Sequence, residues 1–152
     1  MRLAILAVGR AKSSPERELY RHYAERLQWP LSLSEIEQKR RLSSAELKKA
    51  EGKLLVTALP KDAVLWALDP HGKTITSEEF AARIAKERDG GTAVLAFAIG
   101  GADGLADEVL QRATLKLAFG SLTWPHMLAR AMLAEQLYRA QQIITGHPYH
   151  RA

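Results

Sequence analysis

Apolar residues along this chain follow two patterns, continuous runs and a spacing of three and four residues. Continuous runs are typical of strands buried on both faces of a parallel sheet, whereas the wider spacing indicates helices that bury one side. The runs predict strands at residues 3–8, 62–69, 92–99 and 115–119, and the alternating segment 31–37 predicts a half-buried strand nearer an edge. Residues 70–73 are expected to form a turn.

Helices are expected between these strands, and some begin at a recognisable cap. Ser14 precedes the first helix, which ends before Trp29 because a proline follows it. Ser43 or Ser44 caps the second, and Ser43 and Glu46 have the spacing of a capping box. The other helices are predicted at 77–88, 105–112 and 126–145. This alternation indicates an α/β fold, a mostly parallel sheet with helices on both faces, and the length suits one domain, residues 1–152.

The last predicted helix is unusual in its polar residues. Pro125 is tolerated in the first turn of a helix, so the helix begins at about His126, and Gly146 is suited to end it. Three charged side chains interrupt its apolar surface: Arg130, Glu135 and Arg139. We expect them to share one side of the helix, either as a solvated stripe with a Glu135–Arg139 pair or as part of a functional site.

Composition limits the class of protein. Hydrophobic residues make up 47% and charged residues 26%, which is ordinary for a globular protein. No apolar run reaches the length of a membrane helix, and the first run is shorter than a signal-peptide core, so we expect a cytoplasmic protein without a membrane segment. The absence of cysteine excludes disulfides, thiolate catalysis and thiolate metal sites.

The charge is concentrated in the first half of the chain. Residues 1–75 hold 14 Lys and Arg against 9 Asp and Glu, whereas residues 76–152 hold 8 against 8. A basic field attracts anionic partners, of which nucleic acid is the commonest. Lys39, Arg40 and Arg41 are consecutive, and they are either a solvated loop or a contact to an RNA backbone.

Three loops leave the carboxyl ends of predicted strands, where open parallel sheets bind ligands: residues 68–73, 99–104 and 119–124. Glycines in these loops allow a ligand to approach the backbone closely. The segment Ile99-Gly100-Gly101-Ala102-Asp103-Gly104 fits neither the dinucleotide fingerprint nor the phosphate-binding loop, so neither type of site is expected there. Trp124 can line or stack within such a pocket.

The chain ends in a short tail rich in polar aromatic and basic groups, His147 to Arg151. His147 and His150 are spaced as some metal ligands are, but no acidic or thiolate ligand lies near them in sequence, so we expect no metal. No serine has the context of a hydrolase nucleophile. An ordinary frayed terminus does not need this composition, which favours a functional role.

Four segments together resemble, in order and spacing, the RlmH type of 23S rRNA methyltransferases, of the SPOUT class: VLWALDPHGK, AFAIGGADGL, LTWPHMLARAMLAEQLYRA and the terminal HPYHR. The similarity extends over the whole chain. It departs from the family pattern at Arg10, where lysine is more usual, and at Trp124, where a smaller apolar residue is usual.

The resemblance implies an α/β domain with a C-terminal trefoil knot, a homodimer, and S-adenosylmethionine as cofactor. It also implies a set of cofactor-binding residues within the three loops: Leu68, Gly100, Phe119, Gly120, Ser121, Leu122, Thr123 and Trp124. The implied reaction is methylation of N3 of a pseudouridine in 23S rRNA, on the free rRNA or on the assembled ribosome.

Loss of the N3 proton calls for a general base near neutrality, for which His150 is the first candidate and Glu135 the second. Tyr149 supplies an aromatic ring with a hydroxyl, and arginines can hold a phosphate or a base carbonyl by forked hydrogen bonds: Arg130, Arg139 and Arg151. The alternatives are a non-catalytic RNA-binding or ribosome-assembly protein on the same fold and a nucleotide-binding regulatory domain.

Overall fold

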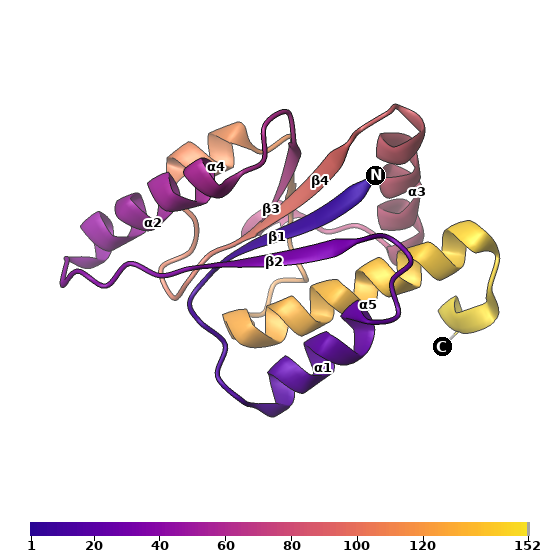
Figure 1. Ribbon diagram of the computed structural model, residues 1–152, viewed down its shortest axis with the longest axis horizontal. Coiled ribbons are helices and arrows are strands. Elements are labelled where there is room, and N and C mark those ends of the chain that lie inside the picture. Colours follow the sequence, from indigo (N-terminus) through magenta and orange to yellow (C-terminus); the bar gives the residue numbers. More distant parts are fainter. Residues whose placement is uncertain (152) are drawn as a thin grey trace.

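A five-stranded sheet forms the centre of the computed structural model, which describes residues 1–151 without the side chain of His150. The strands are β1 (Arg2–Val8), β2 (Leu31–Ile36), β3 (Val64–Lys73), β4 (Val94–Ile99) and β5 (Leu115–Leu117). They lie in the order β2-β1-β4-β3-β5, and every neighbouring pair is parallel (Figure 1). The α/β class is confirmed, and β2 is the predicted half-buried edge strand.

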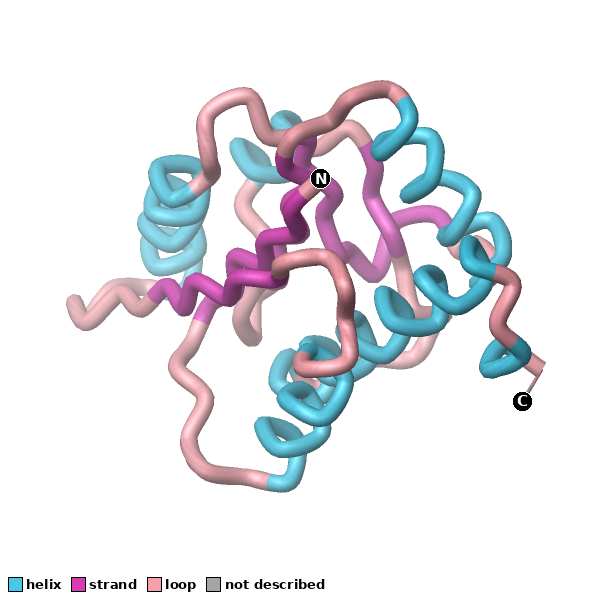
Figure 2. The backbone as a smooth tube through the Cα atoms, turned by 45° about the vertical axis from the view of Figure 1, so that its right-hand side comes forward, coloured by secondary structure: helices cyan, strands magenta, loops and turns pink. Residues whose placement is uncertain are grey.

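Helices cover both faces of this sheet, as predicted: α1 (Pro15–Ala24), α2 (Ser44–Ala58), α3 (Ser77–Asp89), α4 (Asp107–Arg112) and α5 (His126–Thr145). One apolar core joins the sheet to α3 and α5, with α1 packed on α5. A second core, on the opposite face, joins the sheet to α2 and α4 (Figure 2). Alternate residues of β1 and β4 enter alternate cores, which explains why these strands are apolar throughout.

Local signals predicted most helix ends correctly. Ser14 accepts the amide N–H of Arg17, and Ser43 forms a complete capping box with Glu46. The cap of α3 is Thr76, whose hydroxyl accepts the amide N–H of Glu79 at 3.1 Å, and the helix begins at Ser77 as predicted. The fourth helix is shorter than expected and begins at Asp107.

The predicted turn at residues 70–73 is wrong, because β3 continues to Lys73. After a register shift, Lys73 pairs with Leu117 of β5. Gly72 makes this pairing possible, since a β-carbon there would lie 2.6 Å from the carbonyl carbon of Lys116. The glycine that suggested a turn therefore permits a close approach of two strands.

The C-terminal helix begins at His126 and ends at Thr145, and its C-cap is Gly146 with φ 75°, as predicted. A 3-10 helix, η1 (Pro148–His150), follows it. Within residues 1–151, no helix is long and apolar enough to cross a membrane.

Candidate functional site

The three predicted loops meet around one cavity of about 480 Å³. They meet because β3 lies between β4 and β5, and Leu68 is in register with both Ile99 and Leu117. β4 and β5 therefore end level with Leu68, the point at which the register of β3 shifts before the strand continues to Lys73. Of the eight residues proposed for the cofactor, Ser121 does not line this cavity. The other seven do: Leu68, Gly100, Phe119, Gly120, Leu122, Thr123 and Trp124.

The loop after β4 is a tight turn that depends on glycine. Gly101 and Gly104 form an isolated antiparallel bridge, and the Gly104 N–H donates to the Gly101 carbonyl at 3.1 Å. A β-carbon on Gly100 would lie 2.6 Å from the carbonyl carbon of Gly104. Gly100 is therefore required by the folded loop itself, before any ligand is considered.

The segment before α5 is closed by Trp124, whose indole Nε1–H donates to the carbonyl of Phe119 at 2.8 Å. Trp124 is 40% exposed and lines the cavity, so it contributes a wall as expected for that position. Leu122, at 71% exposure, is the most exposed of the large hydrophobic residues described. Gly120 has φ 94°, which a residue with a side chain rarely adopts.

Residues not named for the cofactor also line this cavity: Asp69, Pro70 and Ala102, which lie within the predicted loops, and Pro125, His126 and Ala129, which sequence reasoning missed. The signal for Pro125 and His126 was their position directly after the predicted loop 119–124. Ala129 is one turn into α5, so the start of this helix forms part of the wall.

Glu135 lies in a separate cluster with Arg139 and the C-terminal tail. The predicted Glu135–Arg139 pair is confirmed, with Arg139 Nη2 and Nε at 2.6 and 2.9 Å from Oε1. Both side chains are less than one-fifth exposed. The Tyr149 hydroxyl lies 3.3 Å from the same oxygen, and Gln136 donates to Oε2 at 2.7 Å. Both oxygens of the carboxylate are therefore engaged.

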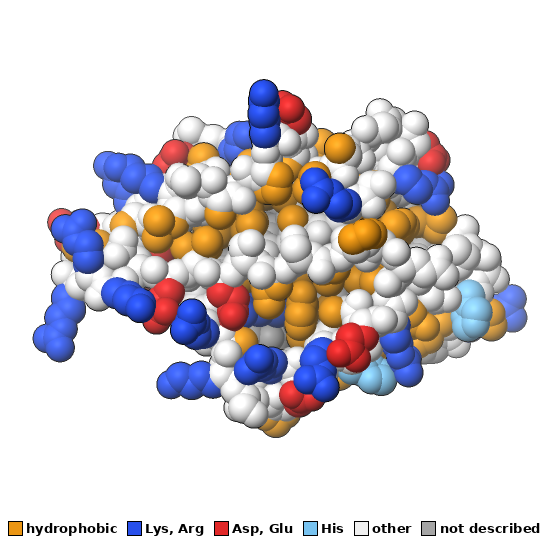
Figure 3. All heavy atoms as spheres, in the orientation of Figure 1, with side chains coloured by type: hydrophobic (Ala, Val, Ile, Leu, Met, Phe, Trp, Pro, Cys, Tyr) orange, Lys and Arg blue, Asp and Glu red, His pale blue; other side chains and the backbone are white. Residues whose placement is uncertain are grey.

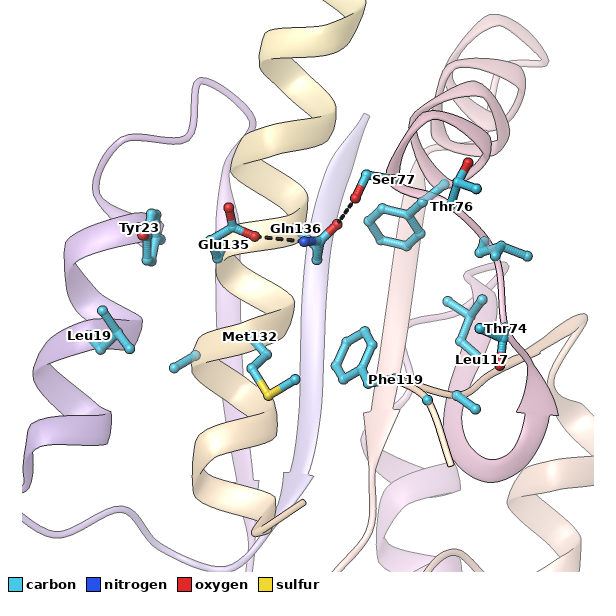
Figure 4. A pocket seen from close by; sticks show the side chains of 15 residues that line it. Leu19, Tyr23, Thr74, Thr76, Ser77, Leu117, Phe119, Met132, Glu135 and Gln136 are labelled. Carbon is cyan, nitrogen blue, oxygen red and sulfur yellow. Dashed lines mark hydrogen bonds between the residues drawn. The ribbon is translucent and has the colours of Figure 1, made fainter. Parts of the chain in front are cut away.

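A second cavity, of about 410 Å³, separates α1 from α3 alongside α5, and Glu135 lines it (Figure 4). Its wall also includes Leu19, Tyr23 and Met132, and a Ser77–Gln136 hydrogen bond of 2.7 Å crosses one end. The two cavities share the segment 117–120 as a common wall. Within one chain, Glu135 lines the second cavity and not the first, whereas Phe119 and Gly120 line both.

Arg130 does not share a side of α5 with Arg139, contrary to expectation. Nine residues at 100° each rotate a helix by about half a turn, which places the two guanidiniums on opposite sides. Arg130 is buried, and it donates to Glu35 at 2.7 Å and to the carbonyls of Val8 and Gly9 at 3.1 and 2.6 Å. Its role is to tie α5 to β1 and β2, so it is not available for a phosphate or a base carbonyl.

Glu35 is the acidic partner of Arg130 and is held in its charged form. Burial raises the pKa of Glu35, but the amide N–H of Ala11 and the Arg130 guanidinium outweigh burial and leave the pKa below its usual value. The pKa of Tyr149 is raised instead, by burial, by Tyr23 and by the Glu135 carboxylate. The Tyr149 hydroxyl therefore stays protonated at neutral pH.

The tail folds back on α5 through Tyr149. Its amide N–H donates to Nδ1 of His147 at 3.2 Å, and its ring meets Tyr138. Arg151 is exposed, whereas the side chain of His150 lies outside the described residues. No group of His, Cys, Asp and Glu with the arrangement of a metal site occurs in the part of the chain that the structure describes.

A family model described as predicted SPOUT methyltransferases matches residues 1–150. Two similar proteins are named ribosomal RNA large subunit methyltransferase H. The one from Rhodospirillum centenum is 57% identical over the full length of both chains, and the one from Paramagnetospirillum magneticum is 54% identical over 99% of each. Among solved structures, a probable methylase family protein from Haemophilus influenzae is similar in fold, with a TM-score of 0.59 and 13% identity over 97% of this chain and 69% of its own.

Proposed function

The chain belongs to the SPOUT methyltransferase family, and we propose that it methylates RNA of the large ribosomal subunit. The specific reaction in this proposal is methylation of N3 of a pseudouridine in 23S rRNA with S-adenosylmethionine as donor. The single observation that carries it is that the segments after Leu68, Ile99 and Leu117 converge on one cavity in a chain of this family.

The cavity suits a nucleoside cofactor in size and lining. Its volume of about 480 Å³ lies in the range of small-molecule sites, and its wall combines apolar side chains with glycine backbone. When bound there, S-adenosylmethionine supplies a methyl group already activated on a sulfonium. The residues proposed to hold it are those of the three loops, including Ser121 at the tip of the last. Their task is to fix the methyl in line with the base, since positioning supplies much of the acceleration.

The tail and the Glu135 cluster supply the groups for the RNA base. We assign the general base to His150, because Glu135 has both oxygens engaged and the Tyr149 hydroxyl stays protonated. Glu135 instead orients Arg139 and Tyr149, and Arg139 and Arg151 bind a phosphate or a base carbonyl. This division of roles follows from the number of hydrogen bonds that each group already makes.

A homodimer belongs to the same proposal. The second cavity lies between α1 and α3 alongside α5, and Leu19 on its wall is exposed. A partner subunit therefore has an apolar surface to cover. Because Glu135 does not line the cofactor cavity of its own chain, the dimer is the arrangement that completes the site. The trefoil knot and a cytoplasmic location remain predictions of this assignment, and the basic loop Lys39 to Arg41 is proposed to contact the RNA backbone.

Two measurements test the assignment. Calorimetry on the purified protein should show S-adenosylmethionine binding in the low-micromolar range. Mass spectrometry of 23S rRNA from a deletion strain should show one methylated pseudouridine missing, and purified protein should restore it on the extracted ribosomes or rRNA. A deletion strain with unchanged rRNA, together with a protein that binds no cofactor, would favour the non-catalytic ribosome-assembly protein.

A further inference from the structure

His126 lies between the cofactor cavity and the turn after β1. It is the first residue of α5 and lines the cavity with Pro125 and Ala129. On its other side is Gly9, where an added β-carbon would lie 3.2 Å from the imidazole Cε1 and 3.7 Å from Nδ1. Gly9 has φ 93°, so the glycine both shapes the turn and leaves room for the ring.

Two buried side-chain nitrogens in the described part of the chain have no hydrogen-bond partner, Nδ1 of His126 and Nε of Arg130. They belong to residues one turn apart on α5. Burial and then the positive charge of Arg130 lower the pKa of His126, so the imidazole is neutral at neutral pH. Two further charged groups lie at this junction: Glu35, which is paired directly with Arg130, and Arg10, which acts on Glu35.

The charge of Arg130 selects the tautomer of this neutral ring. Arg130 is fixed by Glu35 and by the carbonyls of Val8 and Gly9, and its guanidinium can only donate. A lone pair on Nδ1 is favourable beside that charge, whereas an N–H there is repelled. The single proton of the ring therefore belongs on Nε2. Since Nδ1 is wholly buried and the ring lines the cavity, Nε2 is the nitrogen that faces the ligand.

We propose that His126 donates a hydrogen bond from Nε2–H to the carboxylate of the cofactor's amino-acid group, an inference that rests on the proposed function. The carboxylate is the one anionic group of S-adenosylmethionine. It is also the group that the start of a helix favours, and α5 begins at this wall with no side chain capping its first amides. Arg130 acts on the ligand through His126 and is a positioning residue.

Binding of two thioether nucleosides can distinguish this contact from the other contacts in the site. S-adenosylhomocysteine carries the amino-acid group, and methylthioadenosine lacks it. Calorimetry should show that His126→Ala weakens S-adenosylhomocysteine about tenfold and leaves methylthioadenosine within about twofold, the change expected for one hydrogen bond to a charged group. His126→Gln, which keeps a donor near the Nε2 position, should recover part of the loss. His22→Ala, on the exposed helix α1, should change neither affinity.

The tautomer can be measured in the wild-type protein without any ligand. Nitrogen-15 NMR of the imidazole at neutral pH should show a proton on Nε2 of His126 and none on Nδ1. The inference is overturned by a proton on Nδ1, or by a His126→Ala variant that keeps the wild-type preference for S-adenosylhomocysteine. Wild-type protein that binds neither nucleoside overturns the cofactor assignment as well, so the two failures are distinguishable.

Discussion

Tyr138 of α5 meets Tyr149 of the tail edge to face, with ring centroids 4.8 Å apart and planes at 74°. Arg26 lies over the Tyr138 ring and Arg139 over the Tyr149 ring, at 5.8 and 5.1 Å from the centroids. The tail is consequently docked on the helix by a stack of aromatic and cationic groups. Tyr149 is half-buried by this contact.

The Tyr138 ring should hold the tail in its working position. An edge-to-face pair is worth about 0.5–1.5 kcal/mol, or roughly a 3- to 10-fold change in the docked population. Tyr138→Ala should therefore speed removal of the last residues by carboxypeptidase and lower methyl transfer by about that factor, with cofactor affinity unchanged. Tyr138→Phe keeps the ring and should behave as wild type. Equal digestion rates for the alanine and phenylalanine variants would contradict this role.

The Glu35–Arg130 pair should contribute to stability far more than a surface pair. Arg130 is 3% exposed, so Glu35→Ala leaves a buried charge with only carbonyl partners and should cost about 3 kcal/mol in urea unfolding. Glu79→Ala breaks the exposed pair with Arg83 and should cost less than about 1 kcal/mol. Similar losses of unfolding free energy in the two variants would show that the buried pair contributes no more to stability than the exposed pair.

The same pair predicts a pH dependence. A carboxyl whose pKa is lowered in the folded state contributes stability above its unfolded pKa, of about 4.3, and loses it as the pH falls through the folded value. The stability difference between wild type and Glu35→Gln should therefore be constant near neutrality and shrink below about pH 4. Urea titrations at several pH values measure it, and a difference that grows with acid would reverse the sign.

The features that the sequence predicted depend on neighbours within a few residues. Helix caps such as Ser14 and Ser43 act over three positions, and the apolar runs of β1 and β4 reflect burial on both faces. The position of the cofactor cavity could also be predicted from the sequence, because the carboxyl ends of parallel strands lie at one edge of the sheet. The opposed positions of Arg130 and Arg139 could also have been predicted, since nine residues fix the angle between them.

What the sequence could not predict depends on distant pairing. Glu35 meets Arg130 across 95 residues, and no local pattern distinguishes Glu35 from the other charged residues of an edge strand. The extension of β3 to Lys73 requires β5 beside it, and no residue of β3 indicates that this pairing will form. In both cases the deciding interaction forms only after the sheet has assembled.

The loop after β4 should not tolerate a side chain at Gly100. The added β-carbon meets the backbone at Gly104, so Gly100→Val must open the turn and should weaken S-adenosylmethionine at least tenfold. Gly91→Ala is the matched control, because Gly91 has φ 85°, open space around it, and no part in the cavity. It should cost about 1 kcal/mol of stability through backbone strain and leave binding unchanged. Unchanged affinity in Gly100→Val would remove this residue from the site.

The basic loop between β2 and α2 should act through RNA. Lys39, Arg40 and Arg41 are all exposed, and Lys and Arg side chains gather at this end of the molecule (Figure 3). Replacing all three by glutamine should weaken RNA binding and lower its salt slope by roughly one unit for each phosphate that is no longer neutralised. Cofactor affinity should be preserved. Filter binding across a salt series measures the slope, and an unaltered slope would identify the segment as a solvated loop.

The tail should be needed for methyl transfer and not for cofactor binding. A chain ending at Gly146 loses the Tyr149 ring packing but keeps α5 whole, so we expect a folded dimer with a modest loss of stability and cofactor affinity within about threefold of the full chain. Methyl transfer to the ribosomal substrate should fall at least ~100-fold, as expected when an acid–base group is removed.

Single substitutions in the tail then separate the base from its supports. His150→Ala should reproduce much of the truncation's loss if the histidine takes the N3 proton. Tyr149→Phe keeps the ring against Tyr138 and removes only the hydroxyl that lies 3.3 Å from Glu135, so its cost should be smaller. Near-normal turnover by the truncated dimer would rule out a base in the tail. Glu135 would then be the remaining candidate, and Arg139, its strongest partner at 2.6 Å, would have to release it during the reaction.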